Sequence, residues 1–285
     1  MTRTIVVTGG SDGVGAAAAR ALAGQPGAEV VVVGRSAEKT AAVARKTGAE
    51  HHLCDFSSLR QVRELAATLA ARHPRIDVLC SNAGAIFSRR EVTEDGFERT
   101  LQVNHLAPFL LTESLLPQLR AGDGVVVSTA SAAARVGRID LNDLGLSRRW
   151  SPMRAYAASK LMNLVAVRGL VRRYAAEGIS AVALHPGVVA SGFWRSDGGM
   201  MARLLSLPLV DRFSVTPDEG ADTLVWLARG RAGVDWRPGE MYGRRTPMML
   251  PEQARDDAFV DRFYEASTLL VSSQLRSMVP LVRER

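Results

Sequence analysis

The sequence predicts an α/β protein of a single domain, in which a doubly wound parallel sheet lies between two layers of helices. Short apolar runs alternate along the chain with longer runs of helical pattern, which is typical of parallel strands joined by helices. The apolar runs are nearly continuous, as expected of strands buried on both faces. The chain has 285 residues, 47% of them hydrophobic and 23% charged, so it is long enough to bury a large core.

Composition and charge narrow the classes of function. The net charge of +7 raises the question of nucleic-acid binding. The arginines are scattered among acidic residues, however, and no basic run carries interleaved aromatics, so we interpret the charge as a solvated surface that also attracts anionic cofactors. No apolar run approaches the roughly 20 residues that span a bilayer. We therefore expect neither a nucleic-acid partner nor a membrane partner.

The two cysteines and the first expected strand indicate the cellular compartment of the protein. Cys54 and Cys80 stand at the ends of expected buried strands, and two such cysteines argue for a reducing compartment without a disulfide framework. His51 and His52 have no metal-ligand spacing around them, and we interpret them as alternate faces of a strand. We expect residues 1–8 to form a strand already, which would leave no room for a signal peptide or an N-terminal anchor. We expect a cytoplasmic protein with no metal site, and we leave a homo-oligomer open.

The first expected strand, residues 4–8, runs into a glycine-rich turn and then into an alanine-rich helix at about 14–24. Strand, turn and helix in this order are the context that a dinucleotide-binding site requires. The glycines permit a tight turn and a close approach of backbone to pyrophosphate, and the helix N-terminus offers unpaired N–H groups to the phosphates. The candidate cofactor residues of this turn are Gly9, Ser11, Asp12, Gly13, Val14 and Gly15.

Further apolar runs predict the remaining strands, and helical pattern fills the intervals between them. The expected strands cover residues 29–33, 51–54, 76–81, 124–130 and 179–184, with a short one near 240–242. The expected helices cover about 37–47, 59–72, 94–119, 152–177 and 217–230. The tail at 251–273 has the spacing of an amphipathic helix and forms a C-terminal extension.

Two segments depart from this rhythm. The connection over residues 132–153 is longer than a typical βα loop, which indicates a functional role. Residues 188–216 place bulky side chains such as Trp194 and Phe213 among small and polar residues. We interpret this segment as a lid over a bulky, lipophilic or aromatic substrate, because such pockets have apolar walls with few polar groups. The alternative is that these residues only pack the core.

Polar and glycine residues follow the expected strands at their carboxyl ends. In an open parallel sheet, ligands bind beyond these ends, at the point where the strand order reverses. The convergence of these residues therefore predicts a single site for cofactor and substrate. Besides the glycine turn, they are Arg35, Ser36, Asp55, Phe56, Asn82, Ala83, Gly84, Ser131, Pro186 and Gly187.

Tyr156 and Lys160 lie four residues apart and therefore on one face of the expected helix. Ser151 is the expected N-cap of this helix and Gly178 its stop. Free tyrosine has a pKa of about 10, and a nearby ammonium favours the phenolate, so the spacing predicts a tyrosine acid/base. The alternative is an ordinary surface pair. Lys160 is also one of only three lysines in an arginine-rich chain, with Lys39 and Lys46.

Taken in order, these motifs resemble the short-chain dehydrogenase/reductase family over about residues 4–191. The long gap between Ser131 and Tyr156 and the C-terminal helix resemble its retinol-dehydrogenase-like branch. Ser81 and Ser191 stand where the family commonly has asparagine and threonine. The resemblance rests on Thr8-Gly9-x-x-x-Gly13-x-Gly15, on Ser81-Asn82-Ala83-Gly84, on Val103-Asn104-His105, on Ser131, Tyr156 and Lys160, and on Pro186-Gly187-Val188-Val189-Ala190-Ser191.

The resemblance implies a Rossmann-type fold and hydride transfer between a nicotinamide and a small-molecule carbonyl or alcohol. Tyr156 would give or take the hydroxyl proton, and Ser131 would hydrogen-bond the substrate oxygen. Lys160 would lower the tyrosine pKa and bind the nicotinamide ribose, and Asn104 would hold a proton-relay water. Ser131 is the serine that the alignment favours, and Ser128 is the alternative. Val188, Val189 and Ser191 would complete the cofactor site.

The end of the second expected strand predicts NADP (NADPH) rather than NAD as the cofactor. A site selective for NAD needs an acid at this place for the ribose 2′-hydroxyl. This chain has Arg35 there, whose guanidinium can bind a 2′-phosphate, and Ser36 follows it. Asp12 in the glycine turn argues against NADP, unless its side chain points to solvent or caps the helix. The alternative function is a cofactor-binding regulator on the same fold without turnover.

Overall fold

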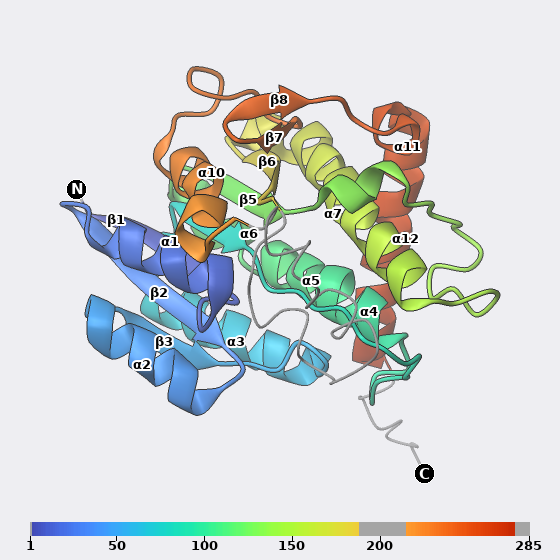
Figure 1. Cartoon of the computed structure of the whole chain (residues 1–285), viewed down its shortest axis with the longest axis horizontal. Helices are drawn as coiled ribbons and strands as arrows, with labels where there is room; N and C mark the ends of the chain where they lie inside the picture. The colour runs from blue at the N-terminus through green and yellow to red at the C-terminus, as the bar shows by residue number, and fades with distance from the viewer. Residues whose placement is uncertain (1, 188–214, 277–285) are drawn as a thin grey trace, which may run out of the picture.

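In the part of the chain that the structure describes, eight strands form one sheet in the order β3-β2-β1-β4-β5-β6-β7-β8. The computed structural model describes residues 2–187 and 215–276, which are drawn in colour in Figure 1. The strands from β1 to β7 run parallel, and β8 pairs antiparallel with β7. The strands are β1 Arg3–Thr8, β2 Ala28–Gly34, β3 Glu50–Leu53, β4 Val78–Ser81, β5 Val125–Thr129, β6 Ser180–His185, β7 Met241–Gly243 and β8 Thr246–Met248.

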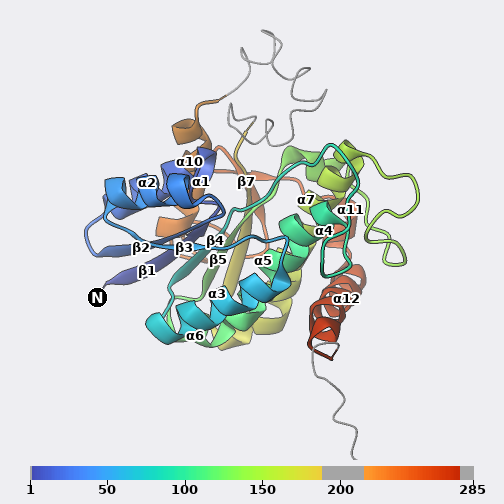
Figure 2. The same cartoon turned by 90° about the horizontal axis from the view of Figure 1, so that it is seen from below.

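Helices cover both faces of the sheet, which confirms the predicted three-layer α/β fold (Figure 2). One face carries α1 Gly13–Ala23, α2 Ala37–Thr47 and α10 Pro217–Arg229. The other face carries α3 Leu59–Arg72, α5 Ala107–Ser114, α6 Leu116–Ala121 and α7 Pro152–Tyr174. Each face has its own apolar core, built from the valines of the strands and the inward faces of the helices.

The helix starts follow from their capping residues. The Asp12 side chain accepts a hydrogen bond from the backbone of Gly13 at the start of α1. Ser151 caps α7, with Pro152 as the first helical residue, as the sequence predicted. After α7, a 3-10 turn over Ala175–Glu177 leads to Gly178, whose φ of 82° ends the helical segment.

The helix predicted over 94–119 is wrong as a continuous element. The structure has a short α4 Arg99–Leu101, a π-helical turn η1 Gln102–Leu106, then α5 and α6. Prolines at the first turns of α5 and α6 remove backbone donors, and the extra residue of the π-turn shifts the helix that follows. The break matters for the site because Asn104 lies within the π-turn.

The C-terminal region also differs from the prediction in detail. The tail forms α11 Glu252–Arg255 and α12 Asp257–Arg276, with the break at the extended residue Asp256. Strand β8 was not predicted, because its hairpin turn uses Arg244 and Arg245 at φ 50° and 59° in place of the usual asparagine and glycine. α12 packs along α7, on the side away from the sheet (Figure 1).

Among residues 2–187 and 215–276, no helix has the length and apolar character needed to cross a membrane. The long α7 and α12 instead carry polar side chains, and several of these join the two helices in ion pairs.

Candidate active site

Helix α7 places Tyr156 and Lys160 on its buried face. The two residues are 8% and 2% exposed, so this is not a surface pair. The Lys160 ammonium lies 5.6 Å from the centre of the Tyr156 ring. Its Nζ donates a hydrogen bond of 3.0 Å to the backbone carbonyl of Thr129, at the end of β5. The lysine is therefore fixed between the helix and the carboxyl edge of the sheet.

Burial shifts the pKa values of both side chains toward their neutral forms. It lowers the pKa of Lys160 to about 8, because the buried ammonium loses hydration. It raises the pKa of Tyr156 to about 12, although a hydrogen bond with Ser131 acts in the opposite direction. The predicted lowering of the tyrosine pKa is therefore wrong for this structure, in which the loss of hydration outweighs the effect of the neighbours.

Ser131 and Ser128 occupy different surroundings. Ser131 caps the 3-10 turn η2 Ala132–Arg135 and contacts the hydroxyl of Tyr156. Its Oγ also accepts a hydrogen bond of 3.2 Å from the backbone of Ala133. Ser128 lies within β5 and lines a cavity between the sheet and α7 together with Ser81 and Asn163. The geometry favours Ser131 as the serine that acts with Tyr156.

Asn104 is fully buried and ties the π-turn to its surroundings. Its Oδ1 accepts a 2.8 Å hydrogen bond from the backbone N–H of Ala85. Its Nδ2 donates to the carbonyl of Ala85 at 2.9 Å and to Ser159 Oγ at 3.0 Å. A Cβ on Gly84 would lie 3.2 Å from Lys160 Nζ and 3.3 Å from Asn104 Oδ1. Glycine at this position therefore lets the loop approach both functional groups.

A hydrogen-bond network joins the ends of β1, β4 and β5. Thr8 Oγ1 accepts from the backbone N–H groups of Asn82 and Ala83 at 3.0 and 3.1 Å. Asn82 Nδ2 donates to the Thr8 carbonyl at 3.1 Å, and Asn82 Oδ1 accepts from Thr129 Oγ1 at 3.0 Å. Thr129, whose carbonyl also binds Lys160, was missed by the sequence analysis. The sequence feature that could have pointed to Thr129 is a hydroxyl residue at the last position of a strand.

The glycine turn before α1 leaves a cradle that side chains would fill. Gly9 and Gly13 have φ values of 65° and 51°, which favour glycine. A Cβ on Gly15 would lie 2.2 Å from the carbonyl oxygen of Gly9 and 2.6 Å from Asn82 Nδ2. The backbone thus turns closely around the N-terminus of α1, which fits a dinucleotide pyrophosphate at this place.

The ends of β1 and β2 bring a second group of charged side chains together. Ser11 lies against Gly34, since a Cβ on that glycine would be 2.8 Å from Ser11 Cβ. Asp12 forms a 2.6 Å ion pair with Lys39, which lowers the pKa of the Asp12 carboxyl. Arg35 follows the last residue of β2 and is exposed, and Ser36 caps α2. Lys39 was not predicted as a cofactor residue. Its position about one helical turn after Arg35 could have pointed to it.

The remaining candidates lie along the same edge of the sheet. Asp55, after β3, accepts hydrogen bonds from the backbone and hydroxyl of Ser57 at 2.9 and 2.8 Å. Phe56 is buried beside it, and Pro186 and Gly187 follow β6. β3 is separated from β1 by β2, so Asp55 stands apart from the Tyr156 group. Val188, Val189 and Ser191, and nearly all of the expected lid at 188–216, lie outside the described residues.

Comparison with known proteins gives one family. The family model for short chain dehydrogenases matches residues 3–200. A Streptomyces protein named as a daunorubicin C-13 ketoreductase is 40% identical over 96% of this chain and 94% of its own length. Human retinol dehydrogenase 13 is 32% identical over 99% of this chain and 87% of its own length.

Solved structures agree with the family match. A Mycobacterium paratuberculosis protein superposes with a TM-score of 0.76 at 32% identity, covering 95% of this chain and 93% of that one. A Burkholderia cenocepacia short chain dehydrogenase in complex with NADP gives 0.63 at 26% identity, over 85% of this chain and 95% of that one. The chain therefore belongs to the short-chain dehydrogenase/reductase family, as an oxidoreductase similar to the retinol dehydrogenases.

Proposed function

We propose that this protein is an NADP-dependent oxidoreductase that interconverts a carbonyl and an alcohol on a bulky, lipophilic or aromatic small molecule. The observation that carries the proposal is the buried pair of Tyr156 and Lys160 at the carboxyl edge of the sheet, with the half-buried Ser131 bonded to the tyrosine hydroxyl. A cofactor-binding regulator has no need of a buried lysine beside a buried tyrosine, because both groups lose hydration there.

The residues divide the chemistry as follows. Tyr156 is protonated at neutral pH, since burial raises its pKa to about 12, so its hydroxyl can donate a proton to a carbonyl oxygen. Ser131 shares the hydrogen bond with that hydroxyl and orients it. Lys160 keeps its charge at neutral pH and stabilises the phenolate that the proton transfer leaves. The bound nicotinamide supplies or accepts the hydride.

Asn104 and Thr129 position the catalytic group. Thr129 holds the Lys160 ammonium through its carbonyl, and Asn104 holds the loop at Gly84 against the same ammonium. Asn104 also bonds Ser159, the residue beside Lys160 in α7. These contacts restrict the lysine to one place, which favours a fixed geometry for proton transfer.

Charge at the end of β2 supports NADP. Lys39 contacts the glycine turn through its ion pair with Asp12, and Arg35 follows the last residue of β2. The first acid after β2 is Glu38, within α2. Asp12 was the residue that argued against NADP. It is paired with Lys39 and caps α1, so the lysine balances its negative charge. A 2′-phosphate would accept charge-assisted hydrogen bonds from both cations. The Burkholderia relative in complex with NADP supports the same choice.

The relatives support the proposed class of substrate, and the cysteines support the proposed cellular compartment. One is named for the C-13 ketone of daunorubicin and others for retinol, which are large molecules with extensive apolar surface. Cys54 and Cys80 are free and buried, which supports a reducing, cytoplasmic setting.

Cofactor selectivity tests the proposal directly. kcat/KM should be measured for NADPH and NADH with a panel of ketones, in the wild type and in Arg35→Ala. Because hydrogen bonds to charged groups contribute about 1.5–3 kcal/mol, the variant should raise the KM for NADPH by roughly 10–150-fold and leave NADH nearly unchanged. Lys46→Met removes an exposed charge at the far end of α2 and serves as the control.

Two results would count against the proposal. Equal use of NADH and NADPH by the wild type would refute the cofactor preference. Tight NADPH binding without oxidation by any member of the panel would favour the regulatory alternative over an enzyme.

A further inference from the structure

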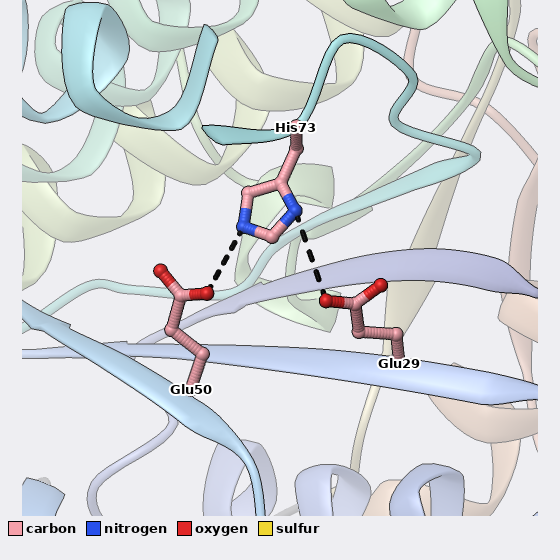
Figure 3. A group of neighbouring side chains, drawn as sticks. All are labelled: Glu29, Glu50 and His73. Atoms are coloured by element: carbon pink, nitrogen blue, oxygen red, sulfur yellow. Dashed lines mark ion pairs between the residues drawn. The ribbon is translucent and has the colours of Figure 1, made fainter. Parts of the chain in front are cut away.

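Three side chains that are distant in the sequence meet at the edge of the sheet opposite the active site (Figure 3). Glu29 lies at the start of β2, and Glu50 is the first residue of β3. His73 follows the last residue of α3, which runs back to the edge where these strands begin. The catalytic group lies at the other edge, because Thr129 is the last residue of a parallel strand.

His73 has a buried nitrogen that makes no hydrogen bond to the residues that the structure describes. The side chain is 6% exposed, and the unsatisfied atom is Nε2. Its contact with Glu50 Oε2, at 3.4 Å, is an ion-pair distance only, and Nδ1 lies 4.0 Å from Glu29 Oε1 (Figure 3). An unsatisfied buried polar atom is costly, so such an atom in a native protein calls for an explanation.

Glu50 is held as a carboxylate with one oxygen facing His73. Its Oε1 accepts hydrogen bonds of 2.6 Å from Arg72 Nε and from His52 Nε2. Oε1 is therefore engaged by two donors that orient the group, while Oε2 faces His73. Glu29 is about half exposed and approaches from the solvent side.

We propose that Glu29, Glu50 and His73 form a binding site for a zinc ion, with water completing the coordination. Zinc binds imidazole nitrogen and carboxylate oxygen at about 2.0–2.2 Å, and two such ligands in tetrahedral geometry lie about 3.4 Å apart. The distance between His73 Nε2 and Glu50 Oε2 is 3.4 Å. One ligand atom from each of the three residues lies within 4.8 Å of the others.

The donor set selects the class of metal. Imidazole with two carboxylates suits zinc, whereas magnesium and calcium take oxygen ligands and often keep several waters. Glu50 already has outer partners of the kind that orient metal ligands, in His52 and Arg72. The sequence predicted no metal site, because these ligands come from three separate elements and form no motif.

The location of the site gives the expected consequence. Zinc would join the starts of β2 and β3 to the end of α3, so it would stabilise the folded chain by binding it in preference to the unfolded chain. The active site lies at the opposite edge, so turnover should not change when zinc binds. The inference is therefore independent of the proposed function.

Titration of the full, chelator-treated chain with zinc chloride tests the site. Calorimetry should show one zinc per chain, and the thermal midpoint should rise with zinc and not with magnesium. His73→Gln and Glu29→Gln should each weaken binding by at least about tenfold. His51→Gln, at an exposed neighbour of Glu50 in β3, should bind as the wild type does. Glu29 is half exposed, so its variant tests the site even if His73→Gln folds poorly.

Arg72 tests the role of the outer partners. Arg72→Gln removes a donor that orients Glu50 through Oε1, so it should weaken zinc binding by roughly 10–100-fold. Absence of a single zinc per chain, or equal affinity in Glu29→Gln and His51→Gln, would overturn the proposal. His73 would then be a buried histidine paired with two carboxylates only.

Discussion

Lys160 and Tyr156 lie one helical turn apart, and burial opposes the charged form of each. A buried ammonium is costly unless something holds it, and here the Thr129 carbonyl is one acceptor. The lysine remains mostly protonated at neutral pH because its pKa is about 8. The site therefore keeps a positive charge close to a neutral phenol, which is the arrangement that the proposed proton transfer needs.

The depressed pKa of Lys160 predicts how stability depends on pH. Below about pH 8 the folded and unfolded chains both hold the proton, and folding carries the full cost of the buried charge. As pH rises from 8 toward 10.5, the folded chain releases the proton first, so the free energy of unfolding rises. Lys160→Met should remove about 2 kcal/mol of the rise between pH 8 and 10, as measured by urea unfolding.

Lys46→Met is the matched control for this experiment. Lys46 is exposed in the last turn of α2, so its loss should leave the wild-type slope intact. An unchanged slope in Lys160→Met would show that the ammonium is not buried as the structure has it.

Spacing within one helix was sufficient to place Tyr156 and Lys160 on one helical face, and a strand end placed Ser131 at the carboxyl edge of the sheet. Their catalytic roles came from the family resemblance and stay predictions. The contacts of Lys39 and Thr129 were not predictable in the same way. Lys39, in α2, forms an ion pair with Asp12, which precedes α1. Thr129, at the end of β5, donates a hydrogen bond to Asn82, which follows the neighbouring strand β4. The shift of the tyrosine pKa also depends on burial, which a helical spacing does not reveal.

The glycine turn and α1 form the element that most constrains the cofactor site. A Cβ on Gly15 would stand 2.2 Å from the backbone oxygen of Gly9, which only a backbone shift can relieve. Gly15→Ala should therefore weaken NADPH binding by at least about tenfold, because the cradle would open. Fluorescence titration of NADPH measures this.

Gly24→Ala is the control within the same helix region. Gly24 caps α1 at φ −73°, and a Cβ there would meet nothing closer than 3.7 Å. NADPH binding to this variant should match the wild type. Equal binding by the Gly15 and Gly24 variants would mean that the turn does not hold the cofactor.

Helix interruptions explain where the element prediction failed. Apolar periodicity continues through residues 94–119, and periodicity alone does not report a π-turn. Asn104 gains its three hydrogen bonds inside that turn, so the interruption serves the site. The β7–β8 hairpin was missed for a related reason: two arginines adopt positive φ there, and Arg245 is held by hydrogen bonds to Asp222.

Across the whole molecule, the alternation of strands and helices was sufficient to predict a parallel sheet with helices on both faces. The packing of α12 on α7 depends on tertiary contacts, and the sequence pattern does not predict which helices will make them. Arg172 pairs with Asp257 and Asp261, and Phe263 is fully buried against His105. The C-terminal extension is therefore part of the core rather than an appendage.

Two variants of α12 should separate buried packing from surface charge. Phe263→Ala removes a fully buried ring and should lower the free energy of unfolding by about 3–5 kcal/mol. Asp261→Ala breaks partly exposed ion pairs and should cost about 1 kcal/mol or less. Urea unfolding measures both. Similar losses would mean that charge, not packing, holds α12 in place.

The role of Tyr156 as the proton donor and acceptor is tested most directly by Tyr156→Phe. The ring still fits its buried position, and the hydroxyl is the only group removed. kcat for NADPH-dependent ketone reduction and the dissociation constant of NADPH should be measured on the same preparation. We expect kcat to fall by roughly 10²–10⁴-fold while NADPH binding stays nearly intact. A variant that keeps more than about a tenth of the wild-type kcat would contradict this account.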